Sequence, residues 1–198
     1  IGGGYIALWN TGGRPILQHQ LPKEAPKWGS GWKQAMHDNY LTSTSIATHG
    51  SVMSYRSNYV DLDPTWRDDY GNPLLRLTFD YQPNEHKMSD YLTDQATKIA
   101  QAIPGATHHA KKREGHYSIV PYQTTHNTGG AAMGDDPRTS VVNRYLQSWD
   151  VPNLWVMGAS VFPQNAGYNP TGTVGALTFW AAEAMKRYLK NPGPLVTT

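Results

Sequence analysis

The chain has 198 residues with 38% hydrophobic and 11% aromatic content, which suits a globular, loop-rich protein that buries a core. Its net charge is +2, and its tight basic cluster, Lys111-Lys112-Arg113, is followed at once by Glu114. We therefore expect a solvated turn there and no nucleic-acid partner. Because the chain contains no cysteine, it has no disulfide, Cys-ligated zinc or iron–sulfur ligand of its own. No run approaches the ~18 apolar residues of a membrane helix.

The first part of the chain alternates weakly patterned segments with turns. Residues 1–40 are rich in Gly, Pro and Trp, and they predict a loop or short strand followed by a short helix near residues 30–39. Residues 42–61 are polar and β-prone. Farther along, Leu75, Leu77, Phe79 and Tyr81 alternate with polar residues, which predicts a half-buried strand.

A change to helical spacing follows Pro83. Met88, Leu92, Ile99 and other apolar residues predict an amphipathic helix over residues 84–103, ended by Pro104-Gly105. His108 and His109 come next, but adjacent histidines point apart and no carboxylate stands at ligand spacing. We expect surface histidines there and no metal site.

Shorter elements are predicted in the last third. Residues 117–122 predict a strand, residues 140–149 a helical or turn-like segment, and the apolar run 153–158 a strand buried on both faces. From Gly172 to about Lys190, apolar residues recur on one side of a predicted helix. Lys186, Arg187 and Lys190 lie in its last turns, where positive charge suits the helix dipole.

Two polar residues in Gly-rich turns are the candidate chemistry. His126 stands beside Thr128 and Gly129-Gly130, small residues that would let another molecule approach closely, although a lone His is more often structural. Asn169 begins an Asn-Pro turn, which is common in loops. Residues 170–173 open a helix, and a helix start presents unpaired N–H groups to an anionic or electron-rich ligand.

Four ordered blocks with matching gaps carry a resemblance to a known family. They are His126-Asn127-Thr128-Gly129-Gly130-Ala131-Ala132-Met133-Gly134, Ser140-Val141-Val142-Asn143, Asn153-Leu154-Trp155-Val156-Met157-Gly158-Ala159-Ser160-Val161-Phe162-Pro163 and Asn169-Pro170-Thr171-Gly172-Thr173-Val174-Gly175-Ala176-Leu177. The set resembles the C-terminal signature of the glucose-methanol-choline (GMC) flavoprotein oxidoreductases, most like the gluconate, sorbitol, fructose and FAD-glucose dehydrogenase branch.

The resemblance implies specific roles. His126 would be the general base that takes the hydroxyl proton as hydride passes to FAD, and Asn169 would hold the substrate oxygen. Gly158 and Ala159 would approach the ribityl-phosphate side of the cofactor, and Pro170 and Thr171 would lie against its isoalloxazine. The implied reaction oxidises the CH–OH group of a sugar, sugar acid or polyol. The implied location is the periplasm or the periplasmic face of the inner membrane, with a small subunit and a cytochrome c subunit as partners.

The same resemblance implies the fold. We expect an α+β chain: an antiparallel substrate-domain sheet with helices, plus the last strand and helix of an FAD-binding α/β domain. Residues 1–124 would form most of the substrate-binding domain, and residues 125–198 a C-terminal segment with the catalytic loops. The dinucleotide fingerprint G-x-G-x-x-G after a strand is absent from the sequence, which starts at Ile1 rather than Met. We therefore expect a missing N-terminal FAD-binding half, without which this piece holds no flavin and shows no turnover.

A different class of function stays open. The chain is alternatively a binding or assembly module without flavin chemistry, with tryptophans of its first 35 positions forming an interface. A hydrolase is disfavoured, since neither G-x-S-x-G nor H-E-x-x-H occurs. Around the two candidate loops, Tyr122, Gln164, Asn165 and Tyr168 could contact a polyol, although packing or loop roles are commoner for such residues.

Overall fold

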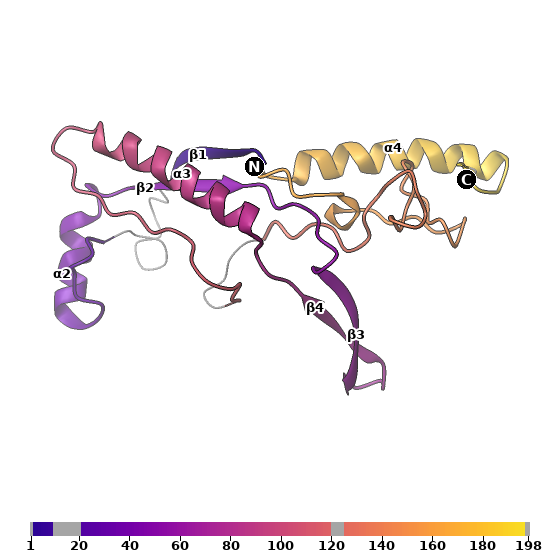
Figure 1. The fold of residues 1–198 in the computed structure, drawn as a ribbon, viewed down its shortest axis with the longest axis horizontal. Helices are drawn as coiled ribbons and strands as arrows, with labels where there is room; N and C mark the ends of the chain where they lie inside the picture. The colour runs from indigo at the N-terminus through magenta and orange to yellow at the C-terminus, as the bar shows by residue number, and fades with distance from the viewer. Residues whose placement is uncertain (1, 10–20, 120–124, 197–198) are drawn as a thin grey trace.

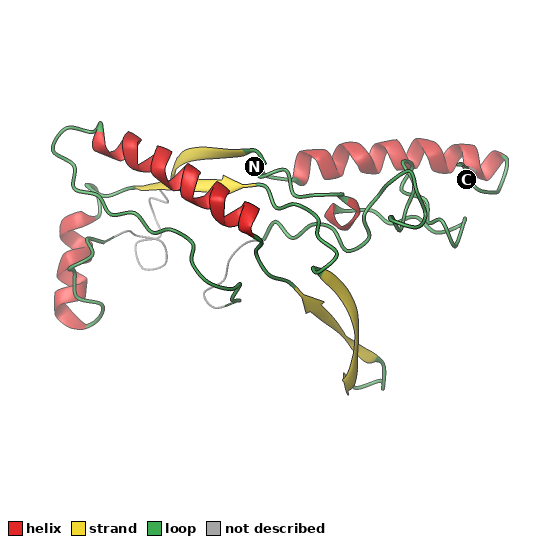
Figure 2. Cartoon of the chain, viewed as in Figure 1, coloured by secondary structure: helices red, strands yellow, loops and turns green. Residues whose placement is uncertain are grey.

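The computed structural model of the chain describes residues 2–9, 21–119 and 125–196. These residues form an elongated α+β arrangement of two separate two-stranded antiparallel sheets and three α-helices (Figure 1). The predicted α+β class with antiparallel strands and helices is confirmed at this level, and the predicted part of an FAD-binding domain stays a prediction. Figure 2 shows how much of the remainder is loop, as the abundance of Gly and Pro indicates.

The first sheet joins segments far apart in the sequence. Strand β1 (Gly4–Trp9) pairs antiparallel with β2 (Ser45–Gly50), and Tyr5 stands directly opposite His49. Helix α3 (Pro83–Gln101) packs against one face of this sheet. A Cβ added to Gly4 would come within 2.9 Å of Leu92, and one added to Gly50 within 2.4 Å of Met88, so the glycines allow the helix to lie close.

Helix α3 confirms the helix predicted over residues 84–103. Pro83 opens it, and Gln82 and Glu85 form a reciprocal capping box, which satisfies backbone donors at the start. Glu85 is only 3% exposed, and its carboxylate accepts hydrogen bonds from the Met53 amide at 3.2 Å and the Tyr55 hydroxyl at 3.1 Å. The charge is thus buried with partners, and the helix is tied to the segment after β2. Helix α2 (Gly29–Asn39) confirms the predicted short helix.

The second sheet is a hairpin that projects from the body of the structure (Figure 1). It pairs β3 (Tyr59–Arg67) with β4 (Pro73–Thr78). Arg76 of β4 links the two strands, because its Nε donates to the carboxylate of Asp61 on β3 at 2.8 Å. The predicted strand exists here, but Leu75 and Leu77 are 72% and 65% exposed, so its prediction as half-buried is wrong in this chain. Phe79 and Tyr81 lie beyond β4 and pack against Tyr117.

The C-terminal third packs loops against helix α4 (Thr171–Lys190), as Figure 1 shows. Its core consists of Val142, Leu146, Val161, Phe162 and Ala181, with Val174 and Leu177 of α4 packed against them. The predicted C-terminal helix is confirmed.

Two other predictions fail or go untested. Residues 153–158 are not a strand: Trp155 makes one isolated bridge to Gln147, and Leu154 and Met157 are exposed. Residues 140–149 are turn-like, as one of the two alternatives proposed. Of the strand predicted over 117–122, residues 117–119 are not in a strand, and residues 120–122 lie outside the described residues. None of the helices in the described ranges is long and apolar enough to cross a membrane.

Candidate active site

The loop that carries His126 runs beside the short 3-10 helix η1 (Ala159–Val161). The amides of Gly129, Ala131 and Met133 donate to the carbonyls of Ala159, Ser160 and Val161 at 3.1, 3.0 and 2.8 Å. These bonds fix the chain just after His126 against the core that Val161 anchors. The His126 side chain itself is half-buried.

A second loop, residues 163–169, leads to Asn169 and closes over the end of strand β2. Val52 and Asn165 exchange backbone hydrogen bonds of 3.2 and 3.1 Å. The Asn165 side-chain amide donates to the His126 carbonyl at 2.9 Å, and its oxygen accepts from the Gly167 amide at 2.8 Å. Asn165 therefore has a loop-building role, which agrees with the commoner of the two roles considered for it.

Gly167 makes this closure sterically feasible. It is buried with a φ of +75°, a region that favours glycine. A Cβ at this position would stand 2.6 Å from the Ser51 amide nitrogen and 2.9 Å from the Gly3 carbonyl oxygen. These are backbone atoms at the end of the β1–β2 sheet, so the loop touches the sheet where only glycine fits.

Four aromatic side chains join the two loops across the sheet. The His126 ring lies 5.8 Å from the His49 ring at 65°, and the His49 ring lies 4.8 Å from that of Tyr5. The Tyr5 ring lies 4.8 Å from that of Tyr168, which directly precedes the exposed Asn169. The loops of the two predicted catalytic residues thus meet on one face of the β1–β2 sheet.

Tyr5 and His49 of this cluster were not predicted as site residues from the sequence. Burial lowers the pKa of His49, and the nearby His126 lowers it further, so the His49 ring is neutral at neutral pH. Burial also raises the pKa of Tyr5, with Tyr168 adding to the effect, and its hydroxyl stays protonated. The available signal was modest: a histidine in a β-prone stretch directly before Gly50-Ser51.

The predicted cofactor contacts lie at the N-terminal ends of two helices, η1 and α4, where glycines leave the backbone open. Gly158 has a φ of +106° and no heavy atom within 4 Å of an added Cβ, and Ala159 follows as the first residue of η1. Pro170 is the N-cap of α4 and Thr171 its exposed first residue, with no side-chain cap on the first-turn amides. Because Val174 packs on the cluster of Val161 and Phe162, the start of α4 lies beside η1.

The N-terminal ends of η1 and α4 are suited to an electron-rich ring. The first amides of α4 have no intrahelical acceptor and carry the positive end of the helix dipole. Gly172, like Gly158, leaves open space where a side chain would stand. A planar group could approach the backbone closely there.

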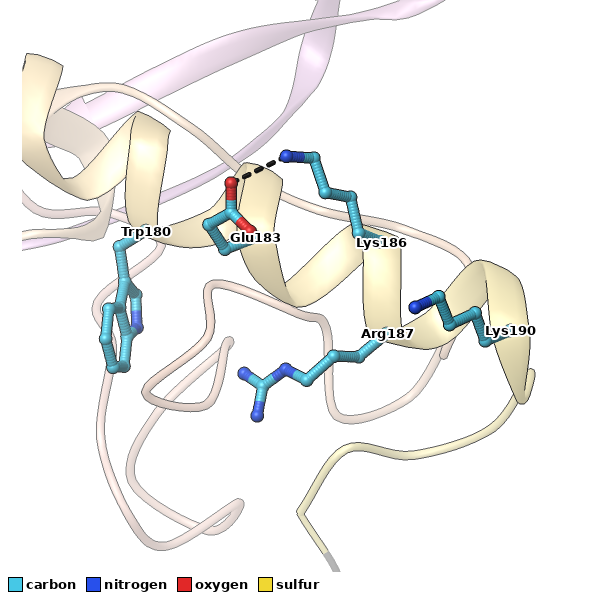
Figure 3. Close-up of a pocket in the computed structure, with 5 residues that line it drawn as sticks. All are labelled: Trp180, Glu183, Lys186, Arg187 and Lys190. Atoms are coloured by element: carbon cyan, nitrogen blue, oxygen red, sulfur yellow. Dashed lines mark hydrogen bonds and ion pairs between the residues drawn. The ribbon is translucent and has the colours of Figure 1, made fainter.

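The described part of the chain also shows what lies elsewhere. It has no group of three or more His, Asp or Glu side chains placed to hold a metal ion, and His108 and His109 are exposed. An open pocket of about 380 Å³ lies along α4 (Figure 3), where Lys186 pairs with Glu183 at 2.7 Å. Its lining includes no predicted site residue.

Comparison with known proteins gives the family. The protein-family model described as GMC oxidoreductase matches residues 54–178 of the chain. The chain is 51% identical over 199 residues to the gluconate 2-dehydrogenase flavoprotein of Pantoea cypripedii, covering 99% of this chain and 32% of that protein.

More distant relatives agree. The 2-methyl-1,2-propanediol dehydrogenase of Mycolicibacterium austroafricanum is 28% identical, over 81% of this chain and 28% of that protein. The fructose dehydrogenase large subunit of Gluconobacter japonicus is 29% identical, over 73% of this chain and 25% of that protein. The chain spans a third or less of the length of these relatives. The family model matches more than half of the chain, and the chain therefore belongs to the GMC oxidoreductase family.

Proposed function

We propose that this chain is the C-terminal portion of an FAD-dependent dehydrogenase that oxidises the CH–OH group of a sugar, sugar acid or polyol. One observation carries the proposal: the loops of His126 and Asn169 meet on the β1–β2 sheet, joined by the Asn165 amide and the ring cluster. The names of the relatives, which refer to gluconate, a propanediol and fructose, support the substrate class.

FAD is the cofactor this arrangement suits. When bound, it would supply the acceptor for the hydride that leaves the carbinol carbon. Gly158 and Ala159 would hold its ribityl-phosphate side, where the backbone is open. Pro170 and Thr171 would lie along the isoalloxazine, and the first amides of α4 would stabilise negative charge there.

The two polar residues divide the work on the alcohol. His126 takes the hydroxyl proton, because a neutral imidazole accepts a proton at ordinary pH, and such general-base help is worth ~10²–10⁴-fold in rate. Asn169 donates a hydrogen bond to the same oxygen and orients it. Asn169 cannot titrate, so the proton has one destination.

The greater length of the relatives supports an extension of the proposal to the rest of the enzyme. The ADP half of FAD would bind to a preceding N-terminal portion that carries the dinucleotide fingerprint, and residues 125–198 would complete that domain with α4. This chain alone would then be inactive. We further propose a location in the periplasm or on the periplasmic face of the inner membrane. A small companion subunit and a cytochrome c subunit would be its partners, and the cytochrome c subunit would receive the electrons.

The test is His126→Ala in the full-length protein. The bound flavin should keep its absorbance, while its reduction by substrate slows by about 10²-fold or more because the general base is gone. His108→Ala, at an exposed histidine, is the matched control and should reduce flavin at the wild-type rate. Wild-type reduction in His126→Ala would remove the proposed role.

The binding-module alternative has its own observation. Trp9 and Trp28 are 47% and 85% exposed, which suits a surface covered by a partner. It predicts no yellow chromophore even when the full-length protein is purified with added FAD, so the absorbance spectrum separates the two functions.

A further inference from the structure

Tyr5 and His49 form a cross-strand pair on the face of the β1–β2 sheet that α3 leaves uncovered. They stand opposite each other in the register, next to the pair Gly4 and Gly50. Gly4 and Gly50 face Leu92 and Met88 of α3. Because successive residues of a strand point to opposite faces, the Tyr5 and His49 side chains point away from α3.

His49 of this pair contacts His126 directly. The Tyr5 hydroxyl lies 3.1 Å from His49 Nδ1, which fixes how the imidazole is turned. The His49 ring also packs edge-on against His126 at a centroid distance of 5.8 Å. The His126 loop thus rests on a ring that is itself held by a hydrogen bond.

We propose that His49 is a positioning residue for His126, with Tyr5 as the anchor that sets the orientation of the His49 ring. This inference rests on the proposed function, because it concerns how the base of that reaction is held. Nothing is transferred in the step: His49 keeps the His126 imidazole in the orientation that accepts the substrate proton.

The chemistry explains why a histidine serves here. Burial lowers the pKa of His49, so it is neutral when His126 takes up a proton, and two adjacent cations are avoided. Among the described residues, the titratable groups facing it are Tyr5 from β1 and His126 from its loop, with Tyr168 behind Tyr5. Glu85 of α3 is on the other side of the sheet and is engaged with Met53 and Tyr55.

A double-mutant cycle in the full-length protein tests the inference. His49→Phe keeps a ring for packing but loses the nitrogen that faces Tyr5. It should slow flavin reduction by roughly 10- to 100-fold, the scale expected for a misplaced catalytic group. In the His126→Ala background the same substitution should change the rate by about twofold or less, since a residue that acts through His126 has nothing left to position.

Two further measurements keep the outcome decisive. Tyr5→Phe preserves the ring contact with Tyr168 and removes only the hydroxyl, so it should slow flavin reduction less than His49→Phe does in the same cycle. It also provides the test in case His49→Phe does not fold. His108→Phe is the surface control. Flavin content and thermal unfolding are recorded for each variant. For Tyr5→Phe the flavin content should match that of the wild type, and the melting temperature should fall only by the effect of one lost hydrogen bond.

The possible failures are distinguishable. If His126→Ala is impaired while His49→Phe and Tyr5→Phe reduce flavin at the wild-type rate, only the positioning role is overturned. Equal losses in the presence and absence of His126 also overturn it, because they indicate a structural effect. If His126→Ala itself is unimpaired, the proposed function falls and the inference with it.

Discussion

The Asn165 side-chain amide donates a 2.9 Å hydrogen bond to the backbone carbonyl of His126. The carboxamide oxygen of Asn165 accepts the Gly167 amide, and its backbone is paired with Val52. One half-buried residue therefore ties together the His126 loop, the loop that leads to Asn169 and the end of β2. The relative placement of the two candidate catalytic residues depends on a residue that needs no contact with substrate.

Asn165→Ala should weaken this tie. Removing the amide takes one hydrogen bond from the His126 carbonyl and one from the Gly167 amide, and we expect a loss of about 1–2 kcal/mol in unfolding free energy. Flavin reduction should also slow, by roughly 10-fold or more, because the base is less well placed. Asn58→Ala is the matched control, since Asn58 bridges to both backbone groups of Asp80 away from the site. It should lose similar stability and keep the wild-type rate; equal rates in both variants would contradict the prediction.

Asn169→Asp tests the substrate-facing amide. A carboxylate has nearly the same shape but cannot donate to the substrate oxygen, and it repels the charge that develops there. By analogy with the removal of an oxyanion donor, the limiting rate should fall by about 10²–10³-fold while FAD stays bound. Asn153→Asp, at another exposed asparagine, should leave the rate unchanged. A colourless Asn169→Asp protein would indicate a structural role for Asn169 instead.

Gly167→Ala should damage the site by two separate effects. The first is the positive φ of +75°, which costs an alanine about 1–2 kcal/mol. The second is the approach of the new Cβ to backbone atoms of Ser51 and Gly3, which cannot yield without opening the loop. Gly115→Ala separates them, because Gly115 has a φ of +71° and open space around it. Thermal unfolding of the full-length variants should show a clearly larger loss for Gly167→Ala, with slower flavin reduction only there.

Those parts of the fold that depend on local sequence could be predicted. Helix α3 is predicted by its apolar spacing, by Pro83 at its start and by Pro104-Gly105 after its end, all within one segment. Helix α4 is likewise predicted by residues within one segment of the sequence. The family blocks singled out His126 and Asn169 in the same way, because each motif is contiguous in the sequence.

The remainder depends on contacts between distant segments. Tyr5 and His49 are 44 positions apart, and no local periodicity shows that they are register partners. The apolar run 153–158 gave the opposite error. Its composition suits a buried strand, but Val156 instead donates to the Leu146 carbonyl at 3.0 Å and joins the core around that turn. The run is therefore neither a strand nor buried on both faces, because Leu154 and Met157 stay exposed.

The pH dependence of stability should carry the signature of His49. Its folded pKa is lowered below the ordinary value of 6.5, mainly by burial. As pH falls below about 6.5, the unfolded chain binds a proton that the folded chain refuses, so stability decreases until the folded pKa is passed. The melting temperature of His49→Phe should therefore fall less than that of the wild type over this acidic window.

His116 provides a control of opposite sign. Asp80 raises its pKa through a side-chain hydrogen bond, so its stabilising contribution is present below about pH 6.5 and is lost as pH rises through the folded value. His116→Phe should therefore leave the acidic loss due to His49 in place and alter the curve on the alkaline side. An identical acidic slope in His49→Phe and wild type would contradict the assignment.

Gln147 offers a prediction on stability away from the site. Its side chain is 1% exposed, and its Nε2 donates to the carbonyls of Pro152 and Gly193 at 2.7 and 3.0 Å. Its Oε1 accepts the Leu195 amide at 2.8 Å, so this amide fastens the segment after α4 to the core. Gln147→Glu places a carboxylate oxygen against two carbonyl oxygens in a buried setting. The expected loss is about 3 kcal/mol in unfolding free energy, since a buried charged group is left facing acceptors.

Denaturant unfolding of the full-length protein measures this loss. Acidification should recover part of it in Gln147→Glu, because a protonated carboxyl group regains a donor for one of the two carbonyls. Gln101→Glu, at the exposed end of α3, makes the same chemical change and should stay within about 0.5 kcal/mol of the wild type. Flavin reduction should be normal in both variants, because the Gln147 side chain contacts the segment after α4, here called the tail, and not the loops of His126 and Asn169. An unfolding midpoint for Gln147→Glu equal to that of Gln101→Glu would show that the tail does not depend on this amide.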